Sequence, residues 1–376
     1  MSKAAELANL IGNINAGGGG VNRNVIINGA MNVAQRSTSE ADIGATSGYY
    51  VCDRWKINTS TGGRFTVSQD SSAPSGFANS LKFDCTTADA SIASDEQIIL
   101  QQRIEGQNLQ AFAKGTSDAK PFAVSFYVKG NASATYICEI RDRDNSRDAG
   151  KTFNVTTDWT RVELTFDADT TGALDDDNAR SFDFNIILHA GGDFITGTLS
   201  NTFAANATGN RVGNTGDGST SNISSFVDST DRTFFITGVQ LEVGQNPTSF
   251  EHINNFGEEL AKCQRYFEIR ERDSANTSFG NGFATTTTSG RILLPYLVQK
   301  RSDEPTLTAT GTANLRFSTT GTSRNISSGS IAMDGGGNKN NAVMNLSGLS
   351  GSVTDGTGAT IILVTGDSSL QFNDEL

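Results

Sequence analysis

The chain has 376 residues, more than one hydrophobic core usually serves, so we expect two folded regions. It carries 40 glycines but only 5 prolines, and Ser, Thr and Asn are abundant. This composition favours short strands joined by many turns and disfavours a helix-rich α/β enzyme. The formal net charge of −12 argues against sequence-independent binding to nucleic acid, because no basic stripe is present to displace phosphate counterions.

The first element that the sequence predicts is a helix over Lys3–Ile14. Its apolar residues recur at helical spacing and form one stripe, made of Leu7, Leu10, Ile11 and Ile14. A helix this short is marginal in water, so the stripe needs a partner: copies of itself, a docking surface, or the chain's own domain. The glycines Gly17–Gly20 follow as a flexible hinge. We predict that residues 1–21 serve attachment or oligomerisation.

Residues 22–252 are predicted to form one β-sandwich of the jelly-roll type. Val25–Ile27 reads as its first strand and stops at Asn28–Gly29, a strong turn signal. Gly191–Ser225 has few apolar residues and is expected to be a long loop. The further expected strands, many of which alternate apolar and polar residues, are Tyr49–Asn58, Arg64–Ser68, Ser80–Cys85, Gln97–Ile104, Phe122–Lys129, Thr135–Arg141, Arg161–Phe166, Phe182–His189 and Thr233–Glu242.

A short linking helix, residues 253–268, follows the sandwich. Asn246–Pro247 ends the preceding strand, because proline cannot donate to a ladder. Leu260, Cys263 and Phe267 then lie on one side of a helical pattern, with Glu258–Glu259 near the positive end of the helix dipole.

The remainder, residues 269–376, is predicted to be a second, smaller β-rich domain. Aromatic residues almost vanish after Tyr296, so this region can bury little apolar area for each strand. We expect it to associate with other copies rather than stand alone. Its candidate strands are Arg291–Val298, Leu307–Ala309, Leu315–Ser318, Ser330–Met333, Ala342–Leu346 and Thr360–Thr365.

Aromatic side chains are the first place to look for sugar recognition, since pyranose rings stack on Trp or Tyr. Trp55 lies on the predicted strand Tyr49–Asn58 and Trp159 opens the strand pattern WTRVELTF, and we expect both to pack in the core. The remaining candidates for a glycan-binding platform are Tyr49, Tyr50 and Tyr127.

Catalytic signals are absent from the sequence, and we expect no enzyme. Glycoside hydrolysis needs two carboxylates at a set separation, but no motif distinguishes one pair among 41 acidic residues. His189 and His252 are the only histidines, and neither lies in a triad signature, so both are expected to be structural.

Metal binding has one weak signal, the alternating oxygen donors of Asp142, Asp144, Ser146 and Asp148. The segment lacks the central glycine and closing Glu of a calcium loop, and its arginines compete for the carboxylates. We therefore predict no cofactor and assign no metal ligand, while a structural calcium ion stays open.

The four cysteines, Cys52, Cys85, Cys138 and Cys263, are widely spaced in apolar contexts and are expected to be buried free thiols. The first residues have no continuous apolar core of the signal-peptide type, and no segment approaches a membrane span. We expect production in a cytoplasm, without export and without membrane insertion.

Several blocks of the sequence resemble tail-fibre or fibre-like virion proteins of tailed phages that infect marine and cyanobacterial hosts. The resemblance covers residues 1–268, and residues 124–251 are also similar to carbohydrate-binding modules with a jelly-roll fold. The blocks are NRNVIINGAMNVAQR at 22–36, GYYVCDRWK at 48–56, QQRIEG at 101–106, FITGVQLEVG at 235–244 and EELAKCQRYFE at 258–268.

This resemblance implies a homotrimer in the virion, assembled in the host cytoplasm. Its N-terminus would join other virion proteins and its distal part would face host-surface glycans. The expected function is that of a structural and adhesive fibre subunit. A purely structural capsid or tail component, and a polysaccharide-depolymerising tail spike, are the two alternatives.

Overall fold

The computed structural model describes residues 2–15, 23–253, 255–271, 277–311, 315–326, 330–363 and 368–376. The chain divides into two units, Met1–Phe256 with Leu376, and Gly257–Glu375. The expected fold class is confirmed: the protein is mainly β, with a short N-terminal helix, a sandwich, a second short helix and a C-terminal β region. The predicted hinge Gly17–Gly20 lies outside the described residues.

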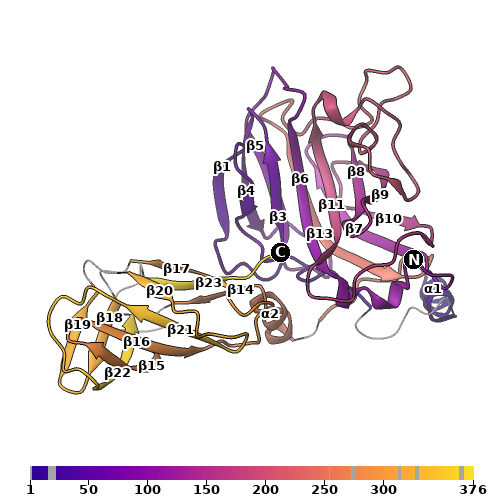
Figure 1. Cartoon of the computed structure of the whole chain (residues 1–376). Coiled ribbons are helices and arrows are strands. Elements are labelled where there is room, and N and C mark those ends of the chain that lie inside the picture. The colour runs from indigo at the N-terminus through magenta and orange to yellow at the C-terminus, as the bar shows by residue number, and fades with distance from the viewer. Residues whose placement is uncertain are drawn as a thin grey trace. The chain divides into compact units, whose positions relative to one another are not determined.

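The first unit is built from two antiparallel sheets, drawn as two layers in Figure 1. Neighbours in each sheet are often distant in the chain, as in jelly-roll sandwiches. Sheet A has the order β1 (Ser39–Ile43), β4 (Arg64–Asp70), β5 (Ser80–Thr87), β13 (Thr233–Val243), β7 (Phe122–Gly130) and β10 (Thr160–Phe166). Sheet B has the order β12 (Ala204–Ala205), β9 (Arg147–Val155), β8 (Ala134–Asp142), β11 (Arg180–Ala190), β6 (Gln97–Glu105), β3 (Lys56–Ser60) and β2 (Gly48–Tyr49).

The core lies between these sheets and follows the two-residue period of the strands. On β7, Val124, Phe126 and Val128 are fully buried, as the alternation predicts. Trp55 is also in the core, with 1% of its surface exposed. Its ring meets Phe184 edge-on at 5.9 Å between centroids, and its indole N–H donates to the Asn28 carbonyl at 3.0 Å. The buried indole therefore has its one polar group satisfied.

Two predicted strands of the sandwich are wrong. Val25–Ile27 is not a strand; it leads into a turn in which Asn28 has φ +58°, and it joins β13 by a hydrogen bond from Val25 N to Leu241 O. Tyr49–Asn58 is not continuous either, because the chain turns between β2 and β3. Three strands of the sandwich were missed, the exposed edge strand β1, the Gly- and Asp-containing β9 and the two-residue β12, since none has a run of large apolar residues.

The segment Gly191–Ser225 contains two 3₁₀ turns, η3 (Gly192–Phe194) and η4 (Thr208–Asn210), and the short strand β12. More of its apolar side chains pack against the sandwich than the sequence suggested. Val212 is fully buried, and it packs with Ile99, Ile137 and Ile187 of sheet B in a cluster separate from the main core. Part of the outer face of sheet B is thereby covered.

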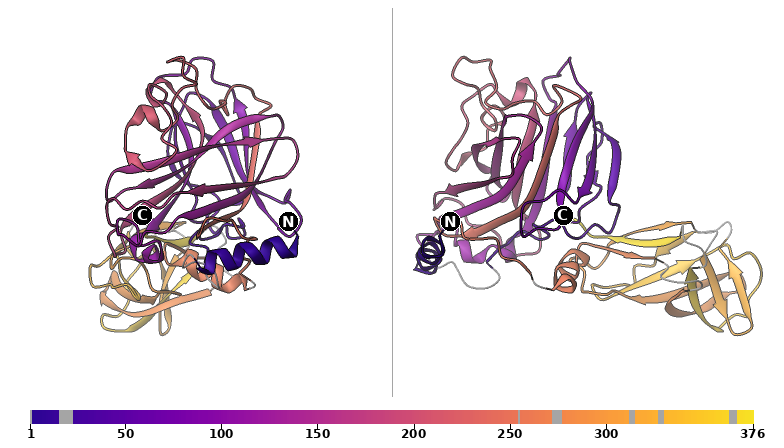
Figure 2. Two further views of the ribbon diagram at one scale, coloured as in Figure 1. Left: turned by 90° about the vertical axis from the view of Figure 1, so that its right-hand side faces the viewer. Right: turned by 180° about the vertical axis from the view of Figure 1, so that it is seen from behind.

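Two α-helices are described, α1 (Lys3–Asn15) and α2 (Phe256–Gln264). Figure 2 shows α1, in indigo, as a helix separate from the two sheets of its unit. Neither helix in the described part of the chain is long and apolar enough to cross a membrane. The predicted linking helix, residues 253–268, is too long at its C-terminal end. The observed helix α2 stops at Gln264, and Phe267 begins strand β14.

The second unit contains a small and a large antiparallel sheet. The small sheet has the order β14 (Phe267–Arg270), β23 (Ser369–Asn373) and β17 (Thr306–Thr310). The large sheet has the order β19 (Thr322–Asn325), β18 (Leu315–Thr319), β22 (Gly358–Leu363), β15 (Thr277–Thr286), β16 (Ser289–Pro295), β21 (Asn341–Leu346) and β20 (Ile331–Met333).

This second unit has its own core, which includes Ile292, Phe317, Met344 and Phe372. Aliphatic side chains supply most of this core, so the small number of aromatic residues does not prevent the region from forming one. Association between copies stays a prediction. Phe283, Leu293 and Leu297 are each about half exposed, at 46%, 48% and 54%.

The four cysteines are free and buried, as predicted. Burial raises the pKa values of the thiols of Cys52, Cys85 and Cys138 above their usual range.

The core position of Trp55 gives a first testable prediction. Trp55→Ala should lower the free energy of unfolding by about 3–5 kcal/mol, because it leaves a cavity and removes the hydrogen bond to the Asn28 carbonyl. Urea unfolding followed by circular dichroism measures the loss. Ile92→Ala is the control, since Ile92 is 46% exposed in the same unit, and it should change stability by less than about 0.5 kcal/mol. Equal effects of the two substitutions would contradict the core assignment.

Candidate functional site

The candidate site lies on the face of sheet A that is directed away from the core. On β7, Phe126 is buried in the core, so the adjacent Ser125 and Tyr127 belong to the other face. The same alternation on β10 places Arg161 and Glu163 there. The strand register pairs Tyr127 with Arg161 and Ser125 with Glu163. Side chains from the two strands are therefore direct neighbours on this outer face.

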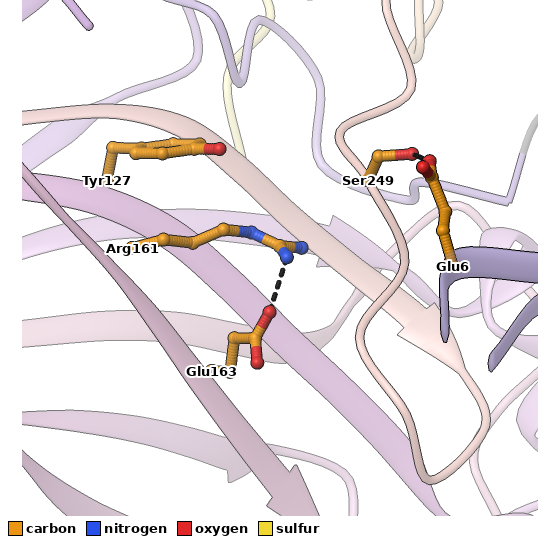
Figure 3. A pocket seen from close by; sticks show the side chains of 5 residues that line it. All are labelled: Glu6, Tyr127, Arg161, Glu163 and Ser249. Carbon is orange, nitrogen blue, oxygen red and sulfur yellow. Dashed lines mark hydrogen bonds and ion pairs between the residues drawn. The ribbon is translucent and has the colours of Figure 1, made fainter. Parts of the chain in front are cut away.

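A pocket of about 360 Å³ opens on this face. It is lined by Glu6, Tyr127, Arg161, Glu163 and Ser249. Figure 3 shows Arg161 directed at Glu163, with which it forms an ion pair, and Ser249 directed at Glu6, to which its hydroxyl donates a hydrogen bond. The volume is within the range of about 300–1,000 Å³ that is typical of small-ligand sites.

A cluster of aromatic rings packs beside Tyr127. Its ring lies 5.3 Å from that of Phe77, which in turn lies 5.1 Å from Phe250 and 5.0 Å from His252. Gly238 makes this approach possible at an irregularity in β13, where it has φ +62°. A Cβ at that position would lie 2.7 Å from the Phe77 ring and 3.0 Å from Tyr127.

A buried polar network fixes the segment that carries Ser249. The Glu242 carboxylate, 1% exposed, accepts hydrogen bonds from the Thr248 backbone N–H at 2.7 Å and from the Thr248 hydroxyl at 2.8 Å. Gln240 donates to the same carboxylate at 2.8 Å, and Arg23 lies 3.3 Å from it. This network therefore fixes the backbone that carries Ser249.

A second aromatic group, the Trp159 patch, lies on the same face and consists of Trp159, Phe235, Lys82 and Lys129. Trp159 is half-buried and lies 6.1 Å from Phe235 between ring centroids. The Lys129 ammonium is 5.4 Å from the Phe235 ring and 6.0 Å from the Trp159 ring, and Lys82 lies 5.7 Å from Phe235. The expectation that Trp159 packs in the core is wrong, because it precedes β10 on the outward side.

This arrangement suits a ligand that has both apolar and hydroxylated surfaces. Tyr127 and Trp159 offer partly exposed ring surface, while Arg161, Glu163 and Ser249 supply donors and acceptors. Sugars combine an apolar ring face with a rim of hydroxyls, so they match this pairing of groups.

The structure does not bring the three predicted tyrosines together. Tyr127 lines the pocket on sheet A, whereas Tyr49 is at the edge of sheet B, with Arg36 over its ring at 5.3 Å. The Tyr50 hydroxyl donates to the Thr46 carbonyl at 2.6 Å, and the ring packs against the core. Burial, together with the nearby Glu40 charge, raises the pKa of Tyr50.

Sequence reasoning missed Trp159, Arg161 and Glu163 as members of a site. The alternation of TRVELTF already placed Arg161 and Glu163 on one face. What it did not supply was the register with β7, which aligns them with Tyr127 from a distant part of the chain.

The predicted anchor helix exposes part of its apolar stripe. Leu7 is 57% exposed and Ile11 is 49% exposed, while Leu10 is half-buried. Ile14 lies within α1, but its side chain is outside the described part of the structure.

The weak calcium signal does not correspond to a shared site. Asp142 binds Lys114, the Asp144 carboxylate accepts from Asp175 N at 3.0 Å, and Asp148 accepts from Asn206. The Ser146 carbonyl also accepts from Asn206, through its backbone N–H at 2.8 Å. Among the residues that the structure describes, no group of three or more His, Cys, Asp or Glu side chains could hold a metal ion.

His189 lies close to both a serine and a carboxylate. Its Nδ1 is 2.9 Å from the Ser225 hydroxyl, and its Nε2 is 3.5 Å from Glu96. The imidazole is fully buried. Glu96 is already engaged as acceptor for the Thr61 hydroxyl at 2.9 Å. His189 lies at the end of the buried strand β11, and its hydrogen bond and ion pair there favour a structural role.

Comparisons with known proteins detect only distant structural similarity. No protein-family model matches the chain, and no curated protein matches it. The enzymatically active domain of tailspike protein 4 from bacteriophage CBA120 is 12% identical, with a TM-score of 0.30, over 59% of this chain and 21% of that one. This chain therefore spans about a fifth of that domain.

Two carbohydrate-binding modules give similar values. The family 11 module of the Clostridium thermocellum cellulase Lic26A-Cel5E is 12% identical, with a TM-score of 0.27, over 58% of this chain and 100% of its own. The N-terminal cellulose-binding domain of Cellulomonas fimi β-1,4-glucanase C is 11% identical, with a TM-score of 0.26, over 57% and 100%. These values are too low to transfer a binding site or a ligand.

The environment of His189 predicts a pH dependence of stability. Burial lowers the pKa of His189, against the opposing effect of Glu96 and Asp89. The unfolded chain then takes up a proton near pH 6.5 that the folded chain does not, so stability is lost as the pH falls below 6.5.

His189→Gln should therefore be less sensitive to pH than the unsubstituted protein. The difference is at most about 1.4 kcal/mol for each pH unit below 6.5. Urea unfolding of both proteins at pH 7.0 and pH 5.5 measures it. The same pH dependence in both proteins would contradict the prediction.

Proposed function

We propose that the protein is a structural and adhesive subunit of a phage fibre, which binds host-surface glycans through the outer face of sheet A. The pocket beside Tyr127 is the observation that carries the glycan-binding part of the proposal. The sequence blocks that resemble phage fibre proteins support the virion part. Binding on this face requires no catalytic group, so the proposed function is not enzymatic.

The glycan would stack on Tyr127 and contact the Arg161–Glu163 pair. Arg161 is anchored by its hydrogen bond to the Ser125 hydroxyl at 3.2 Å and by another to the Thr248 carbonyl. A guanidinium held in this way loses little freedom when a ligand hydroxyl or carboxylate binds. The Trp159 patch would extend the contact to further sugar units along the same face.

Oligomerisation is the second part of the proposal. The exposed Leu7 and Ile11 on α1 support a helix that packs with copies of itself, in a homotrimer, or with other virion proteins. Three weak glycan sites in one fibre, and several fibres in one particle, would raise avidity well above the affinity of one site.

The glycan site is tested by replacing its aromatic platform. Tyr127→Ala should weaken binding to a host surface polysaccharide about tenfold, equivalent to ~1.4 kcal/mol, because the stacking surface is lost. Trp159→Ala should weaken it by a smaller factor. An array of bacterial surface polysaccharides selects the ligand, and titration calorimetry then gives Kd for each variant.

Tyr127→Phe is the matched control, since it keeps the ring and should bind within about twofold of the unsubstituted protein. Unchanged affinity in Tyr127→Ala would contradict the location of the site. If the unsubstituted protein binds no surface polysaccharide, the purely structural alternative is favoured. A fall in polysaccharide size during incubation would instead favour the depolymerase alternative.

The helix is tested by deleting residues 2–15. The deletion should leave the sandwich folded but reduce the oligomer to single chains and prevent incorporation into particles. Light scattering after size-exclusion chromatography measures the mass, and particle purification measures incorporation.

The double variant Leu7→Ser and Ile11→Ser should have the same effect as the deletion. Ala5→Ser is the control and should have no effect, because Ala5 is exposed but lies outside the apolar stripe of the same helix. An intact oligomer in the deleted protein would contradict the assignment.

A further inference from the structure

Lys114 places a positive charge inside the first unit, in a cage of oxygen atoms. Its side chain is only 3% exposed. The ammonium donates to Asp142 Oδ2 at 2.5 Å, to the Thr171 carbonyl at 2.9 Å and to the Gly172 carbonyl at 3.0 Å. Asp169 Oδ2 lies 3.1 Å away. Four oxygens from two carboxylates and two main-chain carbonyls thus converge on one cation.

The cage joins three loops that are far apart in the sequence. Lys114 follows the 3₁₀ turn η2 (Gln110–Phe112), Asp142 ends β8, and residues 169–172 follow β10. Gly172 has φ +72°, and a Cβ there would lie 2.4 Å from Asn145. The backbone at Gly172 is therefore shaped to present its carbonyl at this point, where no side chain fits.

Further hydrogen bonds orient both carboxylates. Asn145 donates through its backbone N–H to Asp142 Oδ1 at 3.0 Å and through its side chain to Oδ2 at 3.0 Å. Arg147 binds both oxygens of Asp169, at 2.9 and 3.1 Å. With Lys114 and Arg147 the cluster is neutral, and without Lys114 it would carry one uncompensated negative charge beside two inward carbonyls.

A set of carboxylate and carbonyl oxygens is what proteins use to bind calcium, at about 2.3–2.6 Å and with water completing the shell. The ammonium lies 2.5 Å from Asp142, which is within this range, and 2.9–3.1 Å from the other three oxygens, which is a few tenths of an ångström longer. We infer that Lys114 is a built-in structural cation: its ammonium occupies an oxygen cage formed by Asp142, Asp169, Thr171 and Gly172 that would otherwise suit a divalent ion of the calcium class. The loops are then held together without any bound metal.

Shortening the Lys114 side chain should therefore convert the cage into a calcium site. Lys114→Ala should lower Tm by about 6–15 °C in EDTA, because one buried carboxylate charge is left uncompensated. Calcium at about a hundredfold excess over Kd should restore about 5–10 °C of this loss. Magnesium should restore little, since it demands a shorter, octahedral shell. Thermal unfolding measures the shifts, and calorimetry measures one calcium ion for each chain.

Lys114→Met is the matched control, because it removes the charge but still fills the cage, so calcium should not rescue it. The unsubstituted protein should have the same Tm in calcium and in EDTA. If Lys114→Ala is recovered only as aggregate, it is refolded in both buffers: folding in calcium alone supports the inference, and equal failure overturns it. Lack of calcium rescue in Lys114→Ala, or equal rescue of Lys114→Met, would also overturn it.

Discussion

The two-residue alternation of side chains along each strand is the constraint on which the rest of this molecule depends. In the first unit, the side chains on the inner faces of both sheets form the core, which includes Phe126 of β7. Trp55, just before β3, packs in the same core. Only outward-facing positions can then meet a ligand. On sheet B part of that outer face is occupied by Val212 and its apolar neighbours. On sheet A the same alternation leaves Tyr127 and Arg161 side by side.

Polar side chains below the surface hold the loops of this unit in fixed positions. Glu242 joins the segment around Thr248 to β13, while Arg211 forms a buried pair with Glu139, with hydrogen bonds of 2.7 and 2.6 Å. Burial alone would raise the pKa of Glu139, but Arg211 and Asn185 keep it below the usual range. Such satisfied networks specify one loop arrangement, so the surfaces that they support are preorganised.

The sequence was most informative where a signal is local. The helix pattern at residues 3–14, the burial of Phe126 and the four buried thiols all follow from spacing or context within a few residues. Trp159 was misassigned as a core residue although the two-residue alternation puts it on the same side as Arg161 and opposite the buried Val162. The pocket, and the oxygen cage around Lys114, depend on strand register and on loops brought together from distant positions, which periodicity within one segment does not contain. The missed strand β9 has the same cause, since its pairing partner β8 decides its conformation.

The burial of all four cysteines has a practical consequence for studies of this protein. A thiol reacts as the thiolate, and burial both shields these sulfur atoms and keeps Cys52 and Cys138 protonated at neutral pH. One cysteine introduced at an exposed position would therefore be the preferred target of a maleimide dye. Fluorescent or cross-linking probes can then be attached at chosen places on either unit without first removing the native residues.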